Sequence, residues 1–200
     1  MRGLAWYALS AQHSSHDPRL LSLTDYLQHA STSDVQIDLD IPRTVRGHKS
    51  FHTRYGRGQC DLFGVLHAMS LMCAECGYCQ GMGPLAAMLL MHMPASHALR
   101  VMRRMHDVYG FHELFRPGFP GLRAEFYVLS QLLDALVPRM AQALAQAGLA
   151  PSAYATRWLL TVFHDALPHA TQLRIWDIFM ACGRDALLVV AVGLLRALDM

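Results

Sequence analysis

The stretch DLFGVLHAMSLMCAECG, residues 61–77, decides the fold class because its apolar residues recur at helical spacing. Four of them follow the i, i+3, i+4, i+7 pattern of a helix face: Leu62, Val65, Leu66 and Met69. Gly77 stands where a glycine commonly ends a helix in the left-handed conformation. We therefore expect a helix over residues 61–75 that ends at Gly77.

Prolines and glycines divide the flanking sequence into further helical segments. We expect helices over residues 84–93, 96–109, 122–137, 151–163 and 173–182, an alanine-rich helix that ends at Gly148, and a last helix capped by Asp185. Residues 111–120 should form a loop, and residues 31–58 a polar loop with short helical turns. No alternating strand pattern is present. The prediction is an all-α fold, with residues 1–200 as one multi-helical domain.

Composition narrows the class of protein. The 200 residues are 53% apolar and only 16% charged, which is typical of a globular chain, and the net charge of +2 does not suggest a nucleic-acid partner. The longest apolar run, residues 186–195, is about half of what a bilayer requires, so no transmembrane segment is expected. Five cysteines without a visible secretory signal favour reduced thiols in the cytoplasm.

Two segments carry residue types suited to the hydrolysis of a phosphate ester. The first, Ile37 to Thr44, places Arg43 three residues after Asp40, so that a helical turn would bring the carboxylate to the guanidinium. The second, Gly77 to Met82, presents Gln80 in a glycine-flanked turn. In phosphoryl transfer an arginine neutralises charge on the transferring group and a glutamine orients the attacking water. From spacing alone, a solvated arginine and an inert glutamine remain the alternative.

The same segments resemble the TBC domain, an all-helical family that activates Rab GTPases. Four blocks match in the family's order: Arg2-Gly3-Leu4-Ala5-Trp6; Ile37, Asp40, Arg43 and Thr44 of Ile-x-x-Asp-x-x-Arg-Thr; Tyr78, Gln80, Gly81 and Met82 of Tyr-x-Gln-Gly-Met; and Trp158, Phe163 and Pro168 followed by Arg174-Ile175-Trp176-Asp177-Ile178-Phe179. The chain ends soon after the last block, so the family's further C-terminal helices are expected to be absent.

The resemblance implies a dual-finger mechanism. Arg43 would be the arginine finger, Gln80 would replace the GTPase's own glutamine in positioning water, and Asp40 would orient Arg43. The other matched residues would support the site or the fold: Tyr78, Gly81, Thr44, Arg2 and Trp6.

The partner implied by the resemblance is a Rab-type small GTPase in its GTP form, as expected for vesicle trafficking. GTP and Mg²⁺ would belong to that partner, so the chain itself would need no cofactor and would have no independent hydrolase activity. The expected location is the cytoplasm, with peripheral association to endomembranes through partners only. A second hypothesis is a binding or scaffold module of the same fold that does not catalyse.

A third hypothesis is a metal protein with cysteine ligands. Cys73-x-x-Cys76-x-x-Cys79 has the spacing of half a zinc site or of the start of an iron–sulfur run, which Cys60, Cys182 or a histidine could complete. Because Cys73 and Cys76 fall on the apolar stripe of the expected helix, we interpret them as small buried hydrophobic residues and expect no metal.

Overall fold

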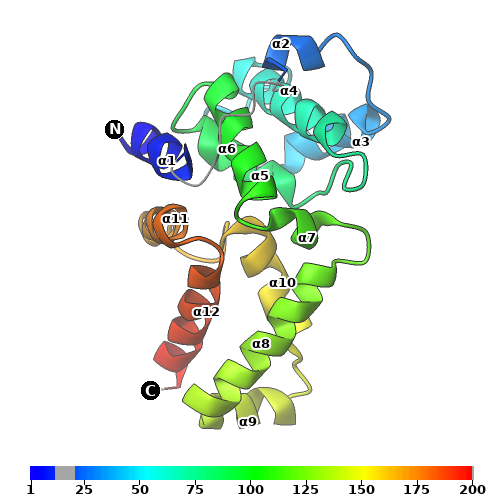
Figure 1. The fold of residues 1–200 in the computed structure, drawn as a ribbon. Coiled ribbons are helices and arrows are strands. Elements are labelled where there is room, and N and C mark those ends of the chain that lie inside the picture. Colours follow the sequence, from blue (N-terminus) through cyan, green and yellow to red (C-terminus); the bar gives the residue numbers. More distant parts are fainter. Residues whose placement is uncertain (12–20, 200) are drawn as a thin grey trace. The chain divides into compact units, whose positions relative to one another are not determined.

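The computed structural model describes residues 1–11 and 21–199, and the regular secondary structure of this part of the chain is entirely helical, with no strand (Figure 1). The all-α prediction is confirmed. The chain divides into two compact units, Met1–Phe115 and Arg116–Met200. Among the described residues, no helix is both long enough and apolar enough to cross a membrane.

The first unit is built around one central helix. Its elements are α1 (Arg2–Ala11), α2 (Leu23–Tyr26), α3 (Asp34–Asp40), the 3₁₀ turn η1 (Ile41–Arg43), α4 (Arg57–Met72), α5 (Met82–Leu90), α6 (Ala95–Asp107) and α7 (Phe111–Phe115). Helix α4 packs against α2, α3, η1, α5 and α6. Because it has neighbours on most sides, it buries small and polar residues as well as its apolar stripe, including Gly64 and His67.

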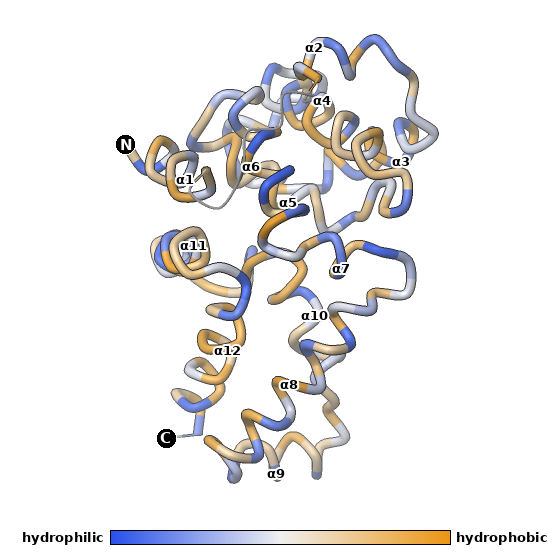
Figure 2. The backbone as a smooth tube through the Cα atoms, in the orientation of Figure 1, coloured by the Kyte–Doolittle hydropathy of each residue, from blue (hydrophilic) through white to orange (hydrophobic). Residues whose placement is uncertain are grey.

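In the described residues of the second unit, 116–199, there are five helices: α8 (Pro120–Leu136), α9 (Pro138–Gln146), α10 (Pro151–Thr161), α11 (His169–Cys182) and α12 (Asp185–Leu198). Helix α8 packs against α9, α10 and α12. Figure 2 shows α12 as largely hydrophobic, in agreement with the apolar run over residues 186–195. Pro138 and Pro151 each occupy the first position of a helix, where a missing N–H costs nothing.

The expected helix over residues 61–75 is displaced toward the N-terminus. It begins at Arg57 and ends at Met72, and Cys73 has extended backbone angles (φ −129°, ψ 100°). Gly77 does adopt the left-handed conformation (φ +56°), but its N–H donates to the Cys73 carbonyl at 2.8 Å and closes a separate turn. The placement of Cys73 and Cys76 on a helix was therefore wrong.

Residues 111–120 are not entirely loop. Phe111, Leu114 and Phe115 form one buried face of the short helix α7, and the rings of Phe111 and Phe115 lie 5.5 Å apart. This packing stabilises a single turn that glycine and proline content alone would not predict. Elsewhere the differences are of a few residues: α11 begins at His169 rather than Leu173, and Asp185 is the first residue of α12 rather than its cap.

Candidate functional site

Asp40, the last residue of α3, is a buried carboxylate with a donor at each oxygen. Its side chain is 2% exposed. The Oδ1 atom pairs with Nη2 of Arg43 and accepts from Nε2 of Gln36 at 2.9 Å, while Oδ2 accepts from the hydroxyl of Tyr78 at 2.9 Å. Such a carboxylate, hydrogen-bonded on both sides, has a fixed orientation and holds the Arg43 guanidinium at one end.

Arg43 is the last residue of the 3₁₀ turn, and its side chain is bonded to Asp40 while remaining accessible to solvent. Its side chain is 58% exposed although one nitrogen is bonded to Asp40. The turn itself is fixed by Pro42 and by Thr44, whose hydroxyl donates to the Asp40 carbonyl at 2.9 Å. The predicted Asp40–Arg43 ion pair is therefore present, and the remaining guanidinium N–H groups are available to an external anion.

Tyr78 links the second predicted segment to the first. Burial raises the pKa of Tyr78 well above its ordinary value, and its hydrogen bond to Asp40 raises the pKa further. The hydroxyl thus remains protonated at neutral pH and acts as the donor in the contact with Asp40. This contact spans 38 residues of sequence and brings the two motif-bearing segments together.

Gln80 lies between two points of attachment to the Arg43 segment. On one side is the bond from Tyr78 to Asp40. On the other is Gly83, which lies so close to Thr44 that an added Cβ would be 3.2 Å from the threonine Oγ1. The side chain of Gln80 is exposed, at the turn that precedes α5. The arrangement holds the backbone of this turn and leaves the amide free to meet another molecule.

The remaining predicted supporting residues have different positions. Gly81 is the residue before α5 and has right-handed helical backbone angles. Trp6 is 1% exposed in α1 and packs edge-on against the ring of His92, 5.0 Å away. Arg2 lies in the first turn of the same helix. Trp6 contributes to the core of the first unit.

Gln36 is a member of the site that we did not predict. It lies four residues before Asp40 on α3 and donates to that carboxylate. The i, i+4 spacing is the usual signal for such a side-chain pair on a helix, and it is present in the sequence. Asp40 is thus bonded to Gln36, Arg43 and Tyr78, which together specify one orientation of the carboxylate.

The sequence of the chain matches one family of known proteins. The profile of the Rab-GTPase-TBC domain family matches residues 1–199. The chain is 41% identical over 183 residues to TBC domain-containing protein C1778.09 of Schizosaccharomyces pombe, covering 91% of the chain and 44% of that protein. It is 31% identical over 204 residues to Rab GTPase-activating protein tbc-11 of Caenorhabditis elegans, covering 98% of the chain and 21% of that protein. The chain thus spans less than half the length of these relatives.

Two solved structures share the fold. One is the Chlamydomonas flagellar RabGAP TBC domain, with a TM-score of 0.80 at 21% identity, covering 99% of the chain and 67% of that domain. The other is the Ypt/Rab-GAP domain of Gyp1p, with a TM-score of 0.75 at 14% identity, covering 98% of the chain and 68% of that domain.

Proposed function

Because the chain belongs to the Rab-GTPase-TBC domain family, we propose that it accelerates GTP hydrolysis by a Rab-type small GTPase, with Arg43 and Gln80 acting in trans. The observation that carries this proposal is the pairing of an exposed, oriented arginine with an exposed glutamine on two segments joined through Asp40. These are the two groups that phosphoryl transfer to water needs and that a GTPase can receive from a second protein.

Arg43 is proposed to stabilise the charge that develops on the transferring phosphoryl group. The ion pair with Asp40 occupies part of the guanidinium and fixes its direction, so that less side-chain entropy is lost when the arginine enters the partner's site. In known systems an arginine finger contributes roughly 10³–10⁵ in rate. Arg43 should therefore act mainly in the transition state and contribute little to ground-state binding.

Gln80 is proposed to position the attacking water. Its amide can accept from the water and donate toward the γ-phosphate, which is the role that a GTPase glutamine otherwise fills. GTP and Mg²⁺ are carried by the partner in this scheme, and membrane association of the chain, on the cytoplasmic side of endomembranes, follows from that partner.

The decisive experiment is single-turnover GTP hydrolysis by a panel of GTP-loaded Rab proteins, with wild type beside Arg43→Ala, Arg43→Lys and Gln80→Ala. We expect wild type to stimulate at least one Rab and Arg43→Ala to lose roughly 10³-fold or more of that stimulation. Arg43→Lys should also be poor, because an ammonium lacks the planar fork of donors. Arg46→Ala, which removes an exposed arginine three residues later, is the matched control and should retain full activity.

Two results would contradict the proposal in different ways. Full stimulation by both Arg43→Ala and Gln80→Ala would show that the finger assignment is wrong. Binding of a Rab without stimulation, by a chain whose far-ultraviolet circular dichroism is helical, would identify a non-catalytic module of the same fold. Complex formation with the GDP form in the presence of aluminium fluoride separates these cases, because a transition-state mimic is bound tightly only where the fingers act.

A further inference from the structure

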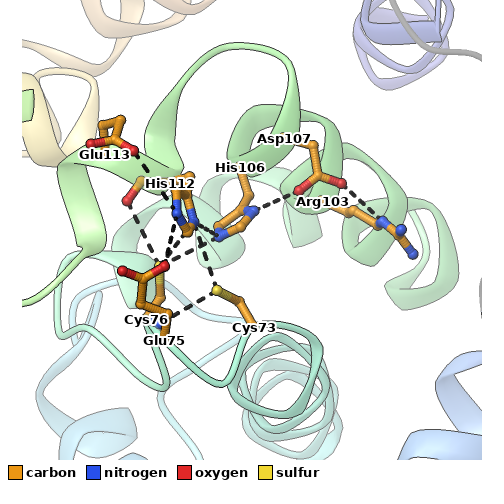
Figure 3. Close-up of polar contacts among 8 residues, drawn as sticks. All are labelled: Cys73, Glu75, Cys76, Arg103, His106, Asp107, His112 and Glu113. Carbon is orange, nitrogen blue, oxygen red and sulfur yellow. Dashed lines mark hydrogen bonds and ion pairs between the residues drawn. The ribbon is translucent and has the colours of Figure 1, made fainter.

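Four side chains with metal-binding atoms converge in the first unit, between the C-terminal end of α4 and the corner that joins α6 to α7 (Figure 3). Cys73 and Cys76 come from the turn after α4, whereas His106 lies in α6 and His112 in α7, one on each side of the corner. Their ligand atoms all lie within 4.8 Å of one another. His106 is 8% exposed, and the other three are partly buried.

Four of the six separations among the ligand atoms are close to the edges of a zinc tetrahedron, and the other two are within 4.8 Å. With Zn–S bonds of about 2.3 Å and Zn–N bonds of about 2.0–2.1 Å, tetrahedral edges are about 3.5 Å between sulfur and nitrogen and about 3.3 Å between nitrogens. The Sγ of Cys76 lies 3.5 Å from Nε2 of His106 and 3.4 Å from Nδ1 of His112. The Sγ of Cys73 lies 3.7 Å from the same His112 nitrogen, and the two ring nitrogens are 3.1 Å apart.

His106 is oriented by a carboxylate on the side away from the cluster. Its Nδ1 lies 2.6 Å from Oδ1 of Asp107, and the second oxygen of that carboxylate accepts from Nε of Arg103 at 3.0 Å. When Nδ1 donates to Asp107, Nε2 carries the lone pair that faces the cluster. A carboxylate behind a histidine is the usual outer partner of a metal-binding imidazole.

His112 also has a carboxylate on the side of its ring that faces away from the cluster. Its Nε2 lies 3.3 Å from Oε2 of Glu75, so its Nδ1 is the atom that faces the cluster. When both rings donate to their carboxylates, two nitrogen lone pairs face each other at 3.1 Å beside the two sulfurs. A cation between these four atoms would convert their mutual repulsion into four bonds.

The backbone also suits a metal site. Cys73 leaves the helix in an extended conformation, and the N–H of Cys76 donates to the Cys73 sulfur at 3.4 Å. The two cysteines are separated by two residues and the two histidines by five, which are spacings found in Cys₂His₂ zinc sites. Cys79, the third cysteine of the run, is not among the four converging residues.

We propose that Cys73, Cys76, His106 and His112 bind one structural Zn²⁺. Two thiolates neutralise the charge of the ion, and an S₂N₂ tetrahedron is a geometry that favours zinc among the divalent metals. All four positions are filled by the protein, so the site is closed and holds structure instead of catalysing. The ion would join the end of α4 to the start of α7 and fix the beginning of the segment that leads to Tyr78.

The test is the metal content and metal spectrum of the purified chain under reducing conditions. After exposure to zinc and removal of unbound metal, elemental analysis should give about one zinc per chain. Zinc-free chain titrated with Co²⁺ should show the strong visible absorption of tetrahedral cobalt together with thiolate-to-cobalt charge transfer. Less than about one tenth of a metal ion per chain, or the weak spectrum of octahedral cobalt, would overturn the proposal.

Variants assign the ligands. Cys73→Ser and His112→Asn should each lower the zinc content at least about tenfold, whereas Cys79→Ser and His52→Asn, which change a neighbouring cysteine and an exposed histidine, should keep about one ion. Asp107→Ala should weaken Co²⁺ binding roughly 10- to 100-fold by removing the partner of His106, even if the ligand variants fail to fold. Full metal content in Cys73→Ser would refute the assignment. None of these measurements depends on GTPase stimulation.

Discussion

The hydroxyl of Tyr78 offers a quantitative test of the hydrogen-bonded group around Asp40. Tyr78→Phe removes one oxygen and keeps the ring, so Oδ2 of Asp40 loses a donor at 2.9 Å while the packing volume is nearly unchanged. Because the Asp40 side chain is only 2% exposed, water would have to enter the site to replace the bond. A hydrogen bond to a charged group contributes roughly 1.5–3 kcal/mol, so we expect the free energy of unfolding to fall by about 2 kcal/mol.

The assay is urea denaturation followed by circular dichroism, with Tyr55→Phe as the matched control. Tyr55 is 67% exposed and its hydroxyl accepts from Arg54 at 2.8 Å, so its loss should change the free energy of unfolding by no more than about 0.5 kcal/mol. If Tyr78→Phe is no less stable than Tyr55→Phe, the reasoning about Asp40 is refuted. If Asp40 also directs Arg43, Tyr78→Phe should lower stimulated GTP hydrolysis by up to about 100-fold, the cost of a misplaced group.

Three further changes test other parts of the fold. Gly58→Ala should lower the free energy of unfolding by roughly 3 kcal/mol, because a Cβ there would lie 2.0 Å from the Ser50 carbonyl oxygen; an unchanged urea midpoint would contradict that close approach. Burial lowers the pKa of His164, so the unfolded chain binds a proton that the folded chain does not, and stability should fall as the pH drops below about 6.5. His164→Gln should reduce this pH dependence, as measured by melting temperature against pH. Chelation of metal should lower the melting temperature of wild type but not of Cys73→Ser, and equal shifts in both would argue against the zinc site.

The fold class could be predicted from the sequence because helical periodicity and proline or glycine punctuation are local signals. Boundaries that depend on tertiary contacts could not be predicted in this way. Cys73 has extended backbone angles although the apolar spacing of the sequence continues through it. The reason is that Cys73 and the turn after it make polar contacts with the α6–α7 corner, which is distant in sequence. Helix α7 forms because Phe111 and Leu114 are buried, which no local pattern indicated.

In the candidate site, too, the local contacts could be predicted from the sequence and the contacts between distant residues could not. The Asp40–Arg43 pair lies within one turn and follows from the spacing of the two residues. The bond from Tyr78 to Asp40 joins residues 38 apart, and only the family resemblance connected the two segments beforehand. The proximity of Cys76 to His106, 30 residues away, had no such support, so the histidines of the proposed zinc site could not be chosen from among the twelve in the chain.

Two contacts hold the Gln80 turn against the Arg43 segment, and they affect the entropy of binding to a GTPase. Since Tyr78 is bonded to Asp40 and Gly83 lies against Thr44, the backbone segments that carry the two proposed finger residues are placed relative to each other during folding. A partner that docks would not have to assemble them, and the entropy of bringing them together would not be subtracted from its binding energy. The pair would reach the nucleotide as a single preorganised unit, so that loosening either attachment should weaken both groups at once.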